Sequence, residues 1–110
     1  MNTARLDRTL AALAVPCRRQ IVELLRERPR RAGELAEATR TSFPAVSRHL
    51  RALRESGLVD EKRDAFDSRV RVYSLHARPM AELKAWLEQT DAMWARQLDA
   101  FRAHVGKTRR

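Results

Sequence analysis

Apolar residues recur along most of this chain at intervals of three and four, the spacing that places them on one face of a helix. Leu6, Leu10 and Leu13 follow this spacing near the start. Pro16 suits the first turn of a second helix, where a missing N–H costs little. The pattern predicts helices at residues 4–14, 16–26, 32–38, 43–56 and 79–104, with 27–31 as a charged loop.

The segment from Thr41 to Leu58 carries its own start and stop signals. Ser42 is a good N-cap, because its hydroxyl accepts a hydrogen bond from a first-turn N–H that otherwise lacks a partner. Pro44 falls in that first turn. Gly57 ends the helix, since glycine adopts the left-handed backbone conformation without a steric penalty.

The side chains of this helix divide into two faces. Val46, Leu50 and Leu53 fall within one narrow sector at about 100° per residue. Arginine side chains match phosphates and the O6/N7 edge of guanine. The pattern fits a helix that contacts DNA, and it equally fits a solvated amphipathic helix. The opposite face carries Pro44, Ser47, Arg48, Arg51 and Glu55.

A β-hairpin is predicted next. Residues 58–63 and 70–75 are rich in branched and aromatic residues and flank the polar loop 64–68. Tyr73 and Leu75 are expected to face the core.

The last helix carries a long apolar seam with coiled-coil-like spacing. One small domain can hardly cover so broad a stripe on a terminal helix, so a second copy of the chain is its natural cover. The alternative is that the helix folds back wholly onto its own domain. The seam is formed by Leu83, Leu87, Thr90, Trp94, Leu98, Phe101 and Val105.

Length and charge narrow the function. A chain of 110 residues supports one domain with a modest core. Its net charge of +9 favours a polyanionic partner, and double-stranded DNA fits the arginines of the predicted helix. The sequence lacks a signal-peptide pattern and any apolar run near the roughly 20 residues that span a bilayer. We therefore expect a cytoplasmic protein without a membrane partner.

Three short runs carry a family resemblance: Gly33–Ala36, Pro44–Leu50 and Leu53–Val59. Through them the chain resembles the ArsR/SmtB-type winged helix-turn-helix repressors, and the resemblance extends over nearly all of it. It implies a mostly α fold with a small β-hairpin, in the order α-α-α-α-β-β-α, that dimerises through its first and last helices. It also implies a single DNA-binding domain, 1–110, with a reading helix at 43–56, a wing at 58–75 and a dimerisation helix at 79–104.

The resemblance also assigns site residues. Asp64 and Asp67 at the wing tip, where the family usually has a glycine, repel phosphate and count against a contact there. The expected DNA-binding residues are Thr41, Ser42, Pro44, Ser47, Arg48, His49 and Arg51, with Arg69 and Arg71 on the wing. The expected dimer interface contains Leu6, Leu10, Leu83, Leu87, Trp94, Leu98 and Phe101.

Metal sensing, the family's best-known activity, lacks its ligands here. The family's thiolate box falls on Gly33–Ala38, which contains no sulfur, and Asp91 and His104 on the last helix lack partners for a closed site. The chain resembles the branch without metal ligands, so no metal or other cofactor is expected and the inducer is unknown. Cys17 is a candidate redox sensor beside Arg18, although a lone cysteine is more often a small buried residue.

Catalysis finds no support, since the sequence contains no glycine-rich phosphate loop, nucleophile elbow or paired carboxylates beside a base. The expected function is a homodimeric repressor of a pseudo-palindromic operator in its own or a neighbouring promoter. Two alternatives stay open: a nucleoid-type protein that binds DNA without reading its sequence, and a protein-interaction module that has lost DNA binding.

Overall fold

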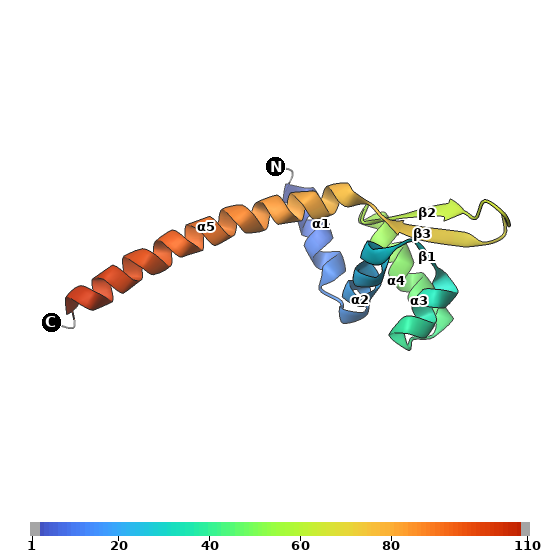
Figure 1. The fold of residues 1–110 in the computed structure, drawn as a ribbon, viewed down its shortest axis with the longest axis horizontal. Helices are drawn as coiled ribbons and strands as arrows, with labels where there is room; N and C mark the ends of the chain where they lie inside the picture. The colour runs from blue at the N-terminus through green and yellow to red at the C-terminus, as the bar shows by residue number, and fades with distance from the viewer. Residues whose placement is uncertain (1–2, 109–110) are drawn as a thin grey trace.

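The computed structural model describes residues 3–108. Helices α1 to α4 and a small sheet form a body, and the long helix α5 leaves it at one side (Figure 1). The molecule is accordingly elongated, with extents of 71 × 29 × 22 Å. In chain order the elements are α1 (Thr3–Leu13), α2 (Pro16–Glu27), β1 (Arg30–Arg31), α3 (Ala32–Thr39), α4 (Phe43–Glu55), β2 (Val59–Arg63), β3 (Arg71–Leu75) and α5 (Ala77–Thr108).

The core forms where the apolar stripes of α2, α3 and α4 meet. The three predicted stripe residues of α4, Val46, Leu50 and Leu53, are all buried, together with Ile21 of α2 and Leu35 of α3. Truncating one buried leucine to alanine typically costs about 2–5 kcal/mol. This packing fixes α4 with its opposite face outward, and α3 and α4 form the helix-turn-helix.

The predicted ends of α4 are confirmed. Ser42 Oγ accepts a hydrogen bond from the Ala45 N–H at 3.3 Å. Gly57 has a φ of +83°, and the following N–H of Leu58 donates to the Leu53 carbonyl at 3.0 Å. That bond closes the helix and folds the buried Leu58 back onto the core.

The sheet contains one strand more than the sequence predicted. Its order is β1-β3-β2, and all pairs are antiparallel. Residues 27–31 were expected to form only a charged loop, but Arg30 and Arg31 pair with Tyr73 and Val72. The prediction was wrong here because two arginines give no alternating pattern, and the strand forms by pairing with β3, which is far away in the sequence.

The hairpin of β2 and β3 is confirmed, and Tyr73 and Leu75 pack against the core as expected. Its loop has no glycine, yet no non-glycine residue of the described hairpin needs a positive φ. Asp64 stabilises the turn without a glycine, because its carboxylate accepts hydrogen bonds from the Phe66 and Asp67 N–H groups at 3.3 and 3.2 Å.

Helix α5 begins at Ala77, two residues before the expected Pro79, and runs to Thr108, past the expected end at 104. A proline is tolerated in the first turn, where N–H groups have no intrahelical partner. Helix α1 packs on the start of α5, where Arg5 forms an ion pair with Glu82 at 2.6 Å. No described helix is long and apolar enough to cross a membrane.

Candidate functional site

The outward face of α4 presents exposed polar side chains. Pro44, Ser47, Arg48 and Arg51 are all exposed, opposite the buried stripe. Neither Arg48 nor Arg51 forms a hydrogen bond or ion pair with another described residue. Two guanidinium groups are therefore available to an anionic partner without breaking an internal contact.

The turn before α4 is held by local hydrogen bonds. Thr41 is partly buried, and its hydroxyl donates to the Thr39 carbonyl at 3.1 Å. Ser42 caps α4 through a lone pair, so its own hydroxyl proton remains free to donate. Of these two expected contacts, Ser42 is exposed to a partner, whereas Thr41 mainly shapes the turn.

His49 lies on the flank of α4 that faces α2. The Nε–H of Arg18 donates to His49 Nδ1 at 3.3 Å, and the ring is partly buried. Burial lowers the pKa of His49, and the positive charges of Arg18 and Arg48 lower it further. The neutral imidazole thus accepts a hydrogen bond that joins α4 to α2.

Both expected wing arginines are bound to carboxylates. Arg69 Nε lies 3.2 Å from Asp67 Oδ1, and Arg71 Nε lies 3.1 Å from Glu61 Oε1. The hydrogen bond from Arg69 holds the pKa of Asp67 below its usual value. The two wing cations that the sequence suggested as available are therefore already paired with carboxylates.

Two hollows separate α4 from the wing. Ser47, Arg69 and Arg71 line one of about 390 Å³, together with Phe43. Arg51 lines the other, together with Arg54, Glu55 and Glu61. The structure thus brings the α4 and wing parts of the predicted site onto one surface, with Pro44 and Arg48 on the outer side of α4.

Sequence reasoning missed three exposed residues of this surface. Arg63 is the cross-strand partner of Arg71, and neighbours of this kind point to the same face of a hairpin. Phe66 at the wing tip is 98% exposed, and Phe43 is exposed in the first turn of α4. The strand register would have placed Arg63, and the aromatic residue in a polar loop was a visible signal for Phe66.

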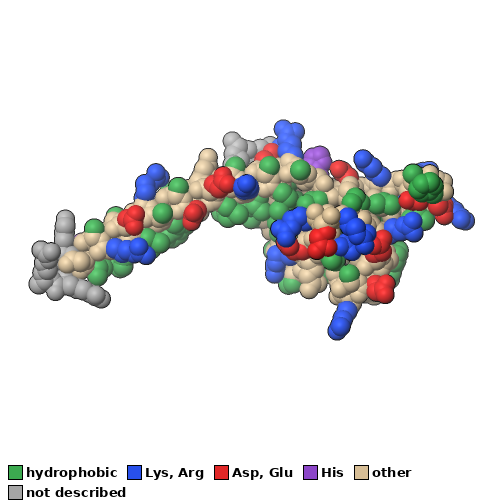
Figure 2. All heavy atoms as spheres, in the orientation of Figure 1, with side chains coloured by type: hydrophobic (Ala, Val, Ile, Leu, Met, Phe, Trp, Pro, Cys, Tyr) green, Lys and Arg blue, Asp and Glu red, His purple; other side chains and the backbone are tan. Residues whose placement is uncertain are grey.

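The expected dimer residues divide into two groups. Leu6 and Leu83 are only 7% and 9% exposed, because α1 packs against α5 within one chain. The others remain uncovered on α1 and along the projecting α5, where Figure 2 shows hydrophobic side chains in green along the lower edge as drawn. These exposed residues are Leu10, Leu87, Trp94, Leu98 and Phe101, with Met93 beside them.

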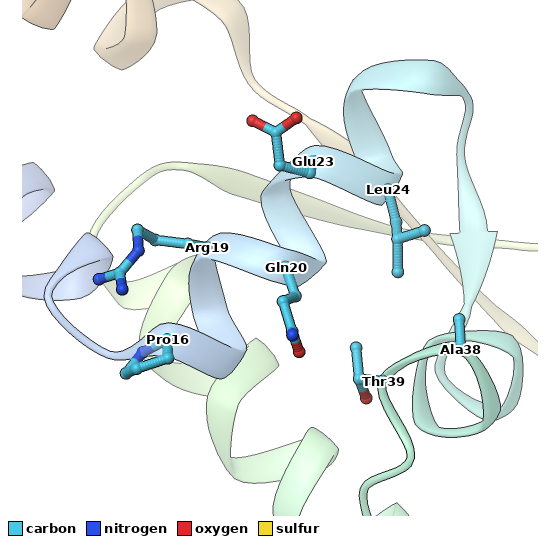
Figure 3. Close-up of a pocket in the computed structure, with 7 residues that line it drawn as sticks. All are labelled: Pro16, Arg19, Gln20, Glu23, Leu24, Ala38 and Thr39. Carbon is cyan, nitrogen blue, oxygen red and sulfur yellow. The ribbon is translucent and has the colours of Figure 1, made fainter.

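The remaining candidates lie apart from the α4 surface. Cys17 is partly buried against the core, with its Sγ 3.7 Å from Thr41 Oγ1. An open groove between α2 and the end of α3 contains Arg19, Gln20 and Glu23 but none of the predicted site residues (Figure 3). Within the described chain, no three His, Cys, Asp or Glu side chains are grouped to hold a metal ion.

Comparisons with known proteins agree with this geometry. A family model described as bacterial regulatory protein, arsR family, matches residues 16–61. The HTH-type transcriptional regulator Rv2034 of Mycobacterium tuberculosis is 39% identical over 95 residues, which cover 86% of this chain and 83% of that protein.

Two solved structures share the fold over most of the chain. An ArsR-like transcriptional regulator from Rhodococcus sp. RHA1 has a TM-score of 0.73 and 29% identity, and the match covers 90% of this chain and 91% of that one. The homodimeric winged helix-turn-helix DNA-binding domain of Mb0332 from Mycobacterium bovis has a TM-score of 0.66 and 26% identity, with 86% and 85% covered.

Proposed function

The chain belongs to the ArsR family of bacterial regulatory proteins, and from this premise we propose that it is a homodimeric repressor of a pseudo-palindromic operator. It is a transcriptional regulator with a winged helix-turn-helix DNA-binding domain, and its relatives are regulators, not enzymes. The operator lies in its own or a neighbouring promoter, and repression follows because the bound protein occludes that promoter. The whole chain, 1–110, acts as one domain in the cytoplasm.

The observation that carries the proposal is the exposed face of α4 with its two unpaired arginines. The buried Val46, Leu50 and Leu53 hold that face outward, and Arg48 and Arg51 meet no competing carboxylate among the described residues. In the major groove an arginine donates two hydrogen bonds to guanine O6 and N7, or it binds a phosphate. The shorter side chains of Ser42 and Ser47 contact the sugar-phosphate backbone of the DNA.

The homodimer is supported by the uncovered seam of α5. Trp94 is 58% exposed on a part of the helix that lies outside the body, and Leu98 and Phe101 follow on the same side. A second copy related by a two-fold axis would bury this seam and present a second α4. Two half-sites about 10 bp apart, or a multiple of that spacing, would then match the two helices.

Selection of the preferred duplex from a random library, followed by competition between that duplex and random DNA, tests the proposal. A specific preference is expected, with a binding free energy gap of about 4–10 kcal/mol. Equal binding to all duplexes would favour the nucleoid-type alternative, and no binding would favour the protein-interaction module.

Arg48→Ala or Arg51→Ala should cost about 1–3 kcal/mol of operator-binding free energy if the side chain reads a base. Wild-type affinity in both variants would contradict the assignment of α4.

Regulation by metal is not expected from the ligands in this chain. A closed tetrahedral site needs four donors at one place, and the one cysteine and three histidines of this chain are dispersed along it. Oxidation of Cys17 is the remaining candidate signal, since its Sγ contacts the turn before α4. A gel shift of wild-type and Cys17→Ser proteins checks both points. Release of the wild-type protein from DNA by Zn(II) would contradict the absence of metal regulation. Equal responses of the wild-type and Cys17→Ser proteins to peroxide would contradict a role for Cys17.

A further inference from the structure

Glu61 on β2 binds arginines from two elements of the DNA-facing surface. One carboxylate oxygen lies 2.8 Å from Arg54 Nη1 of α4, and the other lies 3.1 Å from Arg71 Nε of β3. Tyr73 is the cross-strand partner of Glu61, and burial raises its pKa, with the neighbouring Glu61 carboxylate raising it further. With its side chain only 21% exposed, Glu61 is a fixed acidic group between the helix and the wing.

Its position is one where phosphates would come close. Glu61 lines the hollow between α4 and β2 together with Arg51 and Arg54. If α4 enters the major groove and the wing follows the flanking backbone, the hollow between them faces a phosphate ridge. A carboxylate at that place repels phosphate and competes with it for both arginines.

The arginines around this surface therefore differ in availability. Arg48 and Arg51 have no carboxylate partner among the described residues, whereas Arg54 and Arg71 share one. Arg71 is tied further, because its Nη1 donates to the Ser68 carbonyl at 2.9 Å. An arginine that gives up an ion pair on binding phosphate contributes less to sequence-independent affinity than a free one.

We propose that Glu61 limits the sequence-independent affinity for DNA by withholding Arg54 and Arg71 from phosphates. The carboxylate lowers affinity for DNA of any sequence and leaves discrimination to the unpaired arginines of α4. Asp67 repeats this arrangement on a smaller scale with Arg69 at the wing tip. The inference rests on the proposed function, because it assigns a residue of the same DNA-binding surface.

Glu61→Gln tests it, since the amide keeps the size of the side chain and removes its charge. Binding of a random 30-bp duplex should tighten roughly three- to tenfold near 100 mM salt, and the slope of log K against log salt should steepen by about 0.9 for each released arginine. Binding of the operator should tighten by a similar factor, because phosphate contacts are common to every sequence. Glu23→Gln is the matched control, because it adds the same charge and frees Arg26 on α2, away from the α4 surface.

Arg71→Ala gives a second readout. In the wild-type background this readout does not require that Glu61→Gln folds. In the wild-type background Arg71→Ala should change the random-DNA slope by less than about 0.3, and in the Glu61→Gln background by about 0.9. Circular dichroism and thermal melting check that each variant is folded. A loss near 0.9 in the wild-type background would overturn the inference, as would a Glu61→Gln slope equal to that of Glu23→Gln.

If the wild-type protein shows no operator preference, the proposed function fails. If that preference is present and the Glu61→Gln slope does not steepen, the proposed function stands and the role of Glu61 is wrong.

Discussion

Single residues on α4 owe their roles to the groups that surround them. Arg48 and Arg51 face solvent without a partner among the described residues, while His49, next to Arg48, turns toward α2 and accepts a hydrogen bond from Arg18. The neighbouring cations favour the neutral imidazole. The outer side of α4 is thus free for DNA, and its inner flank is fixed to the body.

His49 should make stability depend on pH. Its pKa in the folded chain lies below the ordinary 6.5. Below that pH the unfolded chain therefore binds more protons than the folded chain. The stability that the neutral ring contributes is present above about pH 6.5 and is lost as the pH falls through 6.5 toward the lowered pKa. The melting temperature of the wild type should therefore fall more, between about pH 7.5 and 5.5, than that of His49→Gln.

Glutamine is the suitable replacement, because its amide oxygen can still accept from Arg18. Carboxylates with lowered pKa, such as Glu34 and Asp67, also affect stability in acid, but they are common to both proteins. Parallel melting curves across this pH range would show that His49 does not titrate differently in the folded state.

Some residue roles were readable from the sequence and others were not. Ser42 and Gly57 were predicted correctly, because a helix cap acts on atoms only a few residues away. The ion pairs of Arg69 and Arg71 were missed, because the strand register and the conformation of the loop bring their carboxylates close. Neither contact follows from a local sequence pattern.

At the scale of elements, the turn between α3 and α4 contains a strained residue. Arg40 at the end of α3 has a φ of +54°, the left-handed region that favours glycine. The N–H groups of Arg40 and Thr41 donate to the Glu37 and Ala36 carbonyls at 3.2 and 3.0 Å, which closes the helix. This turn sets the angle at which α4 leaves α3.

Arg40→Gly should stabilise the protein by about 0.5–1 kcal/mol, since relief of the left-handed strain outweighs the extra freedom of glycine in the unfolded chain. Arg40→Ala is the control, because it removes the same charge without relieving the strain. Urea unfolding of the three proteins gives the comparison. Equal midpoints for the glycine and alanine variants would mean that the turn is not strained.

The elements themselves were largely predictable. Each helix of the body has an apolar stripe of its own, and the hairpin has two branched and aromatic segments around a polar loop. Strand β1 was missed because its two residues are too few to show a pattern and pair with a strand far away in the sequence. The predicted start of α5 is two residues late, because a proline fits any position of the first turn and not its first residue alone.

For the whole molecule, the main feature is the projecting helix α5, whose apolar side is not covered by its own chain. Helix α5 extends well past the part that lies beside α1 (Figure 1). On this helix Leu98 is half exposed, and the exposed Trp94 lies one turn before it. A helix surrounded by water rarely exposes a continuous apolar stripe of this length. A dimer through this seam accounts for both the length of α5 and its apolar side.

Leu98→Glu should break that dimer. A carboxylate buried there without a partner costs about 3–5 kcal/mol, and two-fold symmetry places two of them in the interface. Because Leu98 is not part of the core of one chain, the variant should remain folded and sediment as a monomer at micromolar concentration. Ala92→Glu, exposed on the other side of α5, is the control and should remain a dimer. A wild-type monomer at this concentration would contradict the assembly.

The central claim is that two copies of this chain read a symmetric DNA sequence through α4. A hydroxyl-radical footprint of the wild-type protein on its selected operator tests this most directly. We expect two equivalent protected stretches related by a two-fold axis and separated by about 10 bp or a multiple of it, both lost in the Arg48→Ala, Arg51→Ala double variant. One unpaired stretch, or uniform protection along any duplex, would contradict it.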